Sequence, residues 1–132
     1  MNLRIAEAAD APAVVVLVGG LMAFAGAPNA LGDDALALAQ ALIGDTNANA
    51  IIVADDAGEI VGVCTLTYQR TLRTRGTYAI IQEMFVTPAH RSAGLGSRLV
   101  QRAMQEAQAH GCRTVELGTP PGGDRRWGST SA

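Results

Sequence analysis

The chain has 132 residues, of which 48% are hydrophobic and 17% are charged, and its formal net charge at pH 7 is −2. This length and composition predict a single folded domain over residues 1–132, and the small negative charge gives no field that would recruit nucleic acid or an anionic membrane. All ten basic residues are arginine. The lack of lysine excludes reactions that need a catalytic side-chain amine, and it excludes phosphate loops built on a lysine.

Two further features of the sequence bear on its cellular context. The N-terminus has no basic run followed by an apolar segment, and the apolar run 14–25 is too short to span a bilayer, so a cytoplasmic location is expected. Cys64 and Cys112 stand alone, without the spacing of metal ligands. They are predicted to be buried core thiols, and no metal site is expected.

The first half of the chain is predicted to contain one strand and two helices. Residues 2–5 have a short strand pattern, and Asp10 is a suitable N-cap for a helix over 11–24. This helix is apolar nearly all round, so burial on most of its sides is expected. Asp33 or Asp34 can cap a second helix. The apolar positions of that helix are Leu36, Leu38, Leu42 and Ile43.

The second half is predicted to contain four strands and one helix. The turn Asp-Ala-Gly-Glu, with Gly58, separates the first two of these strands and predicts a hairpin. The crossover rule makes the two strands that flank the helix parallel neighbours. The predicted strands are 50–55, 60–68, 77–86 and 113–118, and the predicted helix is 94–110.

Together these segments predict an α/β (α+β) domain in which a mixed, mostly antiparallel sheet is flanked by helices. The element order is strand, helix, helix, three strands, helix and strand. Residues 119–132 show no strong pattern and are predicted to form a tail.

The stretch "VTPAHRSAGLGSRLV" joins the most apolar predicted strand to the last predicted helix. Pro88 ends the strand, and Gly94 and Gly96 allow a ligand to approach the backbone closely. Free amide groups at the start of the helix form an anion site, and Arg91 adds a full positive charge with a geometry suited to phosphate. The loop therefore predicts a phosphate or pyrophosphate ligand.

Three known phosphate-binding patterns can be compared with this loop. A P-loop needs a lysine, and a dinucleotide fingerprint needs a third glycine where this chain has Leu99. The third pattern, R-x-x-G-x-G, is met by residues 91–96, directly after a strand that ends in V-x-P. In this setting the stretch resembles the acetyl-coenzyme A signature of the GNAT superfamily of N-acyltransferases, and the resemblance covers about residues 1–118.

The resemblance implies a cofactor, acetyl-coenzyme A, and a place for each of its parts. The pyrophosphate is expected on the amides of residues 91–97, and the pantetheine arm is expected to pair with the backbone of residues 84–86. It further implies that the strands at 77–86 and 113–118 diverge to admit the arm. The implied cofactor-binding residues are Met84, Phe85, Val86, Arg91, Ser92, Ala93, Gly94, Leu95, Gly96 and Ser97.

The implied reaction is transfer of an acetyl group to a primary amine of a small molecule or a peptide, by direct attack of the amine. Such a reaction benefits from a general base. Glu83 is the candidate, because a carboxylate is out of place on the strand face that it is expected to share with three apolar residues, Ala79, Ile81 and Phe85. The alternative is a strand carboxylate paired with an arginine such as Arg70 or Arg73.

The acceptor side and the end of the chain carry weaker expectations. Arg73 and Tyr78 are candidate acceptor-binding residues, with a solvated loop and ordinary packing as the respective alternatives. Similar enzymes continue past 113–118 with a helix that carries an acid for the departing thiolate, and then with further strands. Because the chain ends before them, an uncovered sheet edge and a homodimer are expected. A catalytically weak acyl-coenzyme A-binding module is the alternative function.

Overall fold

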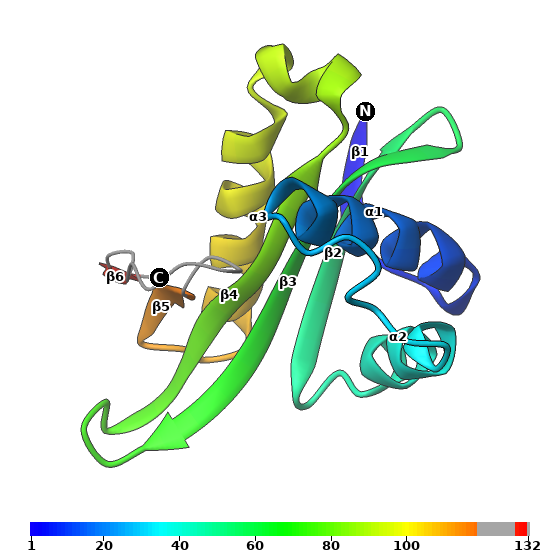
Figure 1. Cartoon of the computed structure of the whole chain (residues 1–132). Coiled ribbons are helices and arrows are strands. Elements are labelled where there is room, and N and C mark those ends of the chain that lie inside the picture. Colours follow the sequence, from blue (N-terminus) through cyan, green and yellow to red (C-terminus); the bar gives the residue numbers. More distant parts are fainter. Residues whose placement is uncertain (119–128, 132) are drawn as a thin grey trace.

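The computed structural model describes residues 1–118 and 129–131. A six-stranded sheet in the order β1-β2-β3-β4-β5-β6 carries α1 and α2 on one face and α3 on the other (Figure 1). The strands are β1 (Asn2–Ile5), β2 (Asn49–Asp56), β3 (Glu59–Thr71), β4 (Gly76–Val86), β5 (Thr114–Leu117) and β6 (Ser129–Ser131). The helices are η1 (Ala8–Asp10), α1 (Ala11–Phe24), α2 (Ala35–Gly44), η2 (Pro88–Ala93) and α3 (Leu95–Ala109), where η marks a 3-10 helix.

The predicted fold class and element order are confirmed through β5. Strands β1 to β4 pair antiparallel in chain order, and β4 and β5 pair in parallel, as the crossover rule predicts. The hairpin between β2 and β3 turns at Ala57 and Gly58, which both have positive φ. Strand β3 runs to Thr71, beyond its predicted end at residue 68, and forms a long ribbon with β4.

In the core between the sheet and α3, the helix contributes one stripe of buried side chains. The side chains that α3 buries are Leu95, Leu99, Ala103 and Ala107. A glycine on β3 allows the helix to lie close to the sheet, since a Cβ on Gly62 would be 3.0 Å from Cδ1 of Leu99. Gly111 follows the helix with φ of +90°, in the left-handed conformation expected of a residue just past a helix end.

Helix α1 covers the opposite face of the sheet with one side only. Its buried residues are Ala11, Val14, Leu17 and Val18. The prediction of burial on most sides holds only in part, because Val16 is 71% exposed and Phe24 is 76% exposed. The helix packs on β3 and β4 and also on α2. Its composition has no polar face that would have marked the exposed side.

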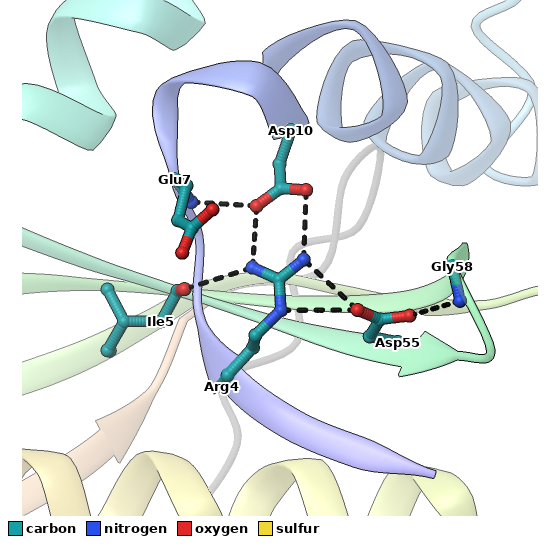
Figure 2. A network of polar contacts seen from close by, with 6 residues as sticks. All are labelled: Arg4, Ile5, Glu7, Asp10, Asp55 and Gly58. Carbon is teal, nitrogen blue, oxygen red and sulfur yellow. Dashed lines mark hydrogen bonds and ion pairs between the residues drawn. The ribbon is translucent and has the colours of Figure 1, made fainter.

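The predicted cap residues Asp10 and Asp34 occupy the N-cap positions of α1 and α2, but neither makes a side-chain capping bond to its helix. Asp10 precedes α1, yet its carboxylate accepts the amide of Glu7 at 2.7 Å and two hydrogen bonds from Arg4. Arg4 also donates to Asp55, whose second oxygen accepts the amide of Gly58 (Figure 2). Arg4 of β1 therefore links Asp10 of η1 with Asp55 at the β2–β3 turn. Asp34 occupies the N-cap position of α2 without a side-chain capping bond.

The end of the described chain differs from the predicted tail. Ser129–Ser131 form β6, which pairs antiparallel with residues 114–116 of β5. The expectation of an uncovered edge at β5 is therefore wrong over these residues, and self-association stays a prediction without that support. Among the described helices, none has the length and apolar character needed to cross a membrane.

Candidate active site

Strands β4 and β5 pair briefly and then diverge. Their register covers residues 79–81 of β4, and the last bond is from the amide of Gly118 to the carbonyl of Ile81, at 2.8 Å. Beyond this point no described strand pairs with residues 84–86 of β4 on the β5 side. The divergence implied by the sequence resemblance is therefore present, and it leaves backbone groups of β4 open to a ligand.

A cavity of about 610 Å³ occupies the space where the two strands separate. Residues 81–86 of β4 line its length, and the end of α1, the first turns of α3 and β5 line its sides. Most of the lining is apolar. Among the described lining residues, the charged side chains are those of Glu83 and Arg91. A cavity of this size with few polar groups is typical of a small-molecule or cofactor site.

The loop that the sequence assigned to phosphate binding lies at the start of α3. Six of its residues form η2, and Gly94 joins η2 to α3 with φ of +72°, a conformation that a side chain disfavours. Gly96 lines the cavity, and a Cβ there would meet nothing nearer than Cε of Met84 at 3.8 Å. Leu95 is buried in the core under α3 and is not part of the cavity lining. The predicted helix start at residue 94 is one residue early.

Arg91 extends from η2 back toward β4. Its Nε donates to the carbonyl of Val86 at 2.9 Å, and its Cζ lies 5.0 Å from the ring centroid of Phe85. The ring of Phe24, on α1, lies 5.4 Å from the same atom. The side chain of Arg91 therefore connects the loop, the strand and α1 at one corner of the cavity.

Glu83 lies on the cavity, but not on the strand face that the sequence predicted. The register between β3 and β4 shifts, so that Leu66 faces Ile81 while Thr65 faces Glu83, and Gln82 is an extra residue. This bulge turns Glu83 toward α1, whereas Ile81 packs in the core under α3. The prediction of a face shared with Ala79 and Ile81 is wrong, since strict alternation stops at the bulge.

The partner of Glu83 is a hydroxyl group. Oγ1 of Thr65 donates to Oε1 of Glu83 at 2.5 Å, and Glu83 forms no ion pair within the described part of the chain. The alternative of pairing with an arginine is not found there. Arg73 pairs instead with Glu116, at 3.1 Å, and lies 4.9 Å from the ring centroid of Tyr78.

Arg73 and Tyr78 are not part of the cavity lining. Their assignment to the acceptor stays a prediction. The sequence analysis did not assign four residues of the cavity lining that come from the end of α1 and from the bulge. They are Leu21, Phe24, Ala25 and Gln82. No local signal marks them, because an all-apolar helix does not indicate which of its residues line a cavity.

Comparison with known proteins decides between the phosphate-binding patterns. A model of the acetyltransferase (GNAT) family matches residues 23–127. The chain belongs to the GNAT acetyltransferase family. Members of this family use acetyl-coenzyme A as cosubstrate, so the GNAT domain seen here is that of an acyl-coenzyme A-dependent acetyltransferase.

Solved structures agree with this assignment. An integron cassette protein from the Cole Harbour Salt Marsh metagenome is 29% identical, with a TM-score of 0.81 over 89% of this chain and 76% of its own. A putative acetyltransferase from Agrobacterium tumefaciens is 27% identical, with a TM-score of 0.74 over 89% of this chain and 80% of its own. An aminoglycoside acetyltransferase from an uncultured soil sample, bound to sisomicin, shares the GNAT fold at 22% identity, with a TM-score of 0.74 over 88% of this chain and 75% of its own. No curated protein sequence matches the chain.

Proposed function

We propose that the protein transfers an acetyl group from acetyl-coenzyme A to the primary amine of a small molecule or peptide, by direct attack of the amine. The observation that carries the proposal is the cavity between β4 and β5, which has the anion-binding loop at one end and Glu83 on its wall. Acetyl-coenzyme A would supply the activated thioester when bound. The GNAT family assignment supports this cosubstrate.

The residues of the loop and of β4 fit the cofactor. The left-handed Gly94 and the open Gly96 keep side chains away from the amides at the start of α3, where a pyrophosphate would be stabilised by free N–H groups and by the helix dipole. The backbone of residues 84–86 would pair with the pantetheine arm, because β5 no longer occupies this side of β4. Arg91 would face the cofactor from the corner that it shares with Val86.

Glu83 is proposed as the general base. A lysine-like amine has a pKa of about 10.4, so only about one molecule in 2,500 is neutral at pH 7, which costs about 4.6 kcal/mol. A carboxylate beside the amine would take a proton from its ammonium form, which frees the lone pair for attack on the thioester carbonyl. The carbon–sulfur bond would then break, and coenzyme A would leave as the thiolate. Thr65 holds Oε1 of Glu83, and Oε2 accepts no hydrogen bond from the described residues, so Oε2 is the oxygen that would take the proton.

Release of coenzyme A measured with a panel of primary amines tests the proposal. We expect the variant Glu83→Gln to lower kcat by about 10²–10⁴-fold, in the range of general-base effects, with a change in KM for acetyl-coenzyme A of less than about twofold. Glu59→Gln is the matched control, because Glu59 is an exposed glutamate at the start of β3. An unchanged pH–rate profile in Glu83→Gln would count against the assignment of the base.

A catalytically weak acyl-coenzyme A-binding module is a second candidate. It is favoured by one observation: the described lining of the cavity has no tyrosine, cysteine or histidine that could protonate the departing thiolate. Calorimetric titration with acetyl-coenzyme A separates the two candidates. Binding that Arg91→Ala weakens, together with no thiol release from any amine, would support the binding module.

A further inference from the structure

We propose that the acceptor is a small monoamine with an apolar, ring-sized side group, and that Phe24 is the residue that selects it. The inference rests on the proposed acetyl transfer, and it names the substrate class of the same site. It follows from the charge, the exposure and the size of the wall that α1 contributes to the cavity.

The charges of the lining favour a single ammonium group. Glu83 is the one carboxylate among the described lining residues, and it faces the α1 side of the sheet. Arg91 is the one cation among them. An acceptor with several ammonium groups would place all but one of them against apolar walls or toward Arg91, and unpaired charges in such surroundings are costly. One ammonium beside Glu83 meets no such obstacle.

The wall that α1 contributes to the cavity is apolar. It consists of Leu21, Phe24 and Ala25, from the last turn of α1 and the residue that follows the helix. Phe24 is 76% exposed although it lines the cavity, and Arg91 approaches its ring to 5.4 Å. A ring carried by the acceptor would remove exposed apolar surface of Phe24 from water, which is favourable in proportion to the area buried.

Because the side chain of Phe24 is largely exposed, its role in acceptor recognition can be tested without a large effect on folding. Neither core cluster of the described structure includes Phe24, so its ring contributes little to the packing of α1 on the sheet. The cavity of about 610 Å³ must also admit the thioester end of the cofactor, which leaves space for a small acceptor. Replacement of Phe24 should therefore alter acceptor selection without unfolding the protein.

The experiment compares kcat/KM for phenethylamine, ethanolamine and sisomicin, measured by release of coenzyme A at saturating acetyl-coenzyme A, so that a change in cofactor affinity through Arg91 does not enter the comparison. We expect phenethylamine to be the best of the three. The variant Phe24→Ala should lower kcat/KM for phenethylamine about tenfold, as loss of one apolar contact does, and change ethanolamine less than about twofold. Phe24→Tyr, which keeps the ring, should retain the activity with phenethylamine. Val16→Ala is the matched control, because Val16 is exposed on the same helix but does not line the cavity.

A binding measurement keeps this inference distinct from the proposed function. Protein preloaded with coenzyme A is titrated with phenethylamine by calorimetry, and Phe24→Ala should weaken binding about tenfold, a change in the range of one apolar contact. If phenethylamine binds and Phe24→Ala weakens this binding, but no thiol is released, the proposed acetyl transfer is overturned and the proposed acceptor class is kept. A higher kcat/KM for sisomicin than for phenethylamine, or equal losses with phenethylamine and ethanolamine in Phe24→Ala, would overturn the inference and keep acetyl transfer.

Discussion

Gly20 of α1 lies directly against the ring of Phe85 on β4, and a Cβ at position 20 would be 2.9 Å from the ring atoms Cε2 and Cζ. Because Phe85 lines the cavity, this contact sets how closely the α1 wall approaches β4. A glycine inside a helix is normally unfavourable, by about 0.5–1 kcal/mol relative to alanine. Its presence here is explained by the space that the aromatic ring requires.

Replacement of Gly20 by alanine should therefore destabilise the protein. Crowding of a packed interior costs about 1–3 kcal/mol, and the gain in helix propensity of about 1 kcal/mol offsets part of that cost. We expect a net loss of about 1 kcal/mol in the free energy of unfolding, measured by urea denaturation. Gly19→Ala is the control, since its Cβ would meet only Cδ1 of Leu31 at 3.9 Å, and it should be neutral or stabilising. Equal effects of the two substitutions would contradict this explanation.

Replacement of Gly94 by alanine should weaken cofactor binding without a steric clash. Nothing lies within 4 Å of a Cβ at this position, so the cost comes from the left-handed backbone with φ of +72°, about 1–2 kcal/mol for an L-residue. We expect the loop to relax away from this conformation, and the Kd for acetyl-coenzyme A measured by calorimetry to rise several-fold. Gly44→Ala, on α2, is equally free of contacts and has no positive φ, so its Kd should not change.

The cluster of Arg4, Asp10 and Asp55 should make stability depend on pH in the acidic range. The hydrogen bonds from Arg4 are the main cause that lowers the pKa of Asp10, helped by the amide of Glu7. A lowered folded-state pKa means that this stabilisation is complete above the unfolded value of about 3.9 and is lost as the pH falls through the folded value. We expect Asp10→Asn to lose about 1–3 kcal/mol at pH 7, as for a hydrogen-bonded charged group.

Denaturation with urea at several pH values tests this dependence. The difference between the wild-type protein and Asp10→Asn should shrink as the pH falls below about 4, because the wild-type carboxyl group then becomes protonated as well. Asp33→Asn, at an exposed aspartate outside this cluster, is the control and should differ little from the wild type at any pH. A difference that stays constant between pH 7 and pH 3 would show that the charge of Asp10 is not the cause.

The two cysteine thiols should be unreactive in the folded protein. Burial is the main cause that raises the pKa of Cys64 to about 12, and burial also raises the pKa of Cys112. At pH 8 a thiol with that pKa is a thiolate in about one molecule in 10,000, and the thiolate is the reactive form. We expect reaction with Ellman's reagent to be slow in buffer and complete in urea. Fast modification of either thiol under native conditions would show local opening of the core under α3.

Most of the elements around the cavity could be predicted from the sequence, because each is indicated by residues that lie close together in the chain. Asp10 marks the start of α1, the apolar stripe from Leu95 to Ala107 defines α3, and the glycines after Arg91 mark the turn from β4 into α3. Gly94 needs a conformation that the residue type itself suggests. Each of these signals is a property of a few neighbouring residues.

The α1 side of the cavity could not be predicted, because it depends on contacts between distant segments. The extra residue Gln82 in β4 is defined only by its register against Thr65, and strict alternation placed Glu83 on the wrong face. Which end of α1 is exposed depends on where the helix crosses the sheet. The sequence does not indicate this, because the exposed Phe24 and the buried Leu17 are both apolar. Both errors arise where tertiary packing decides the direction of a side chain.

The position of Arg91 has a consequence for any attempt to redesign this enzyme. The same guanidinium group touches the ring of Phe24, the ring of Phe85 and the carbonyl of Val86. Replacement of the last turn of α1 by that of a relative would therefore also change the surroundings of the Arg91 guanidinium group, which is proposed to face the cofactor. Selectivity and cosubstrate affinity are thus expected to evolve as linked traits, and engineered variants should be screened for both at once.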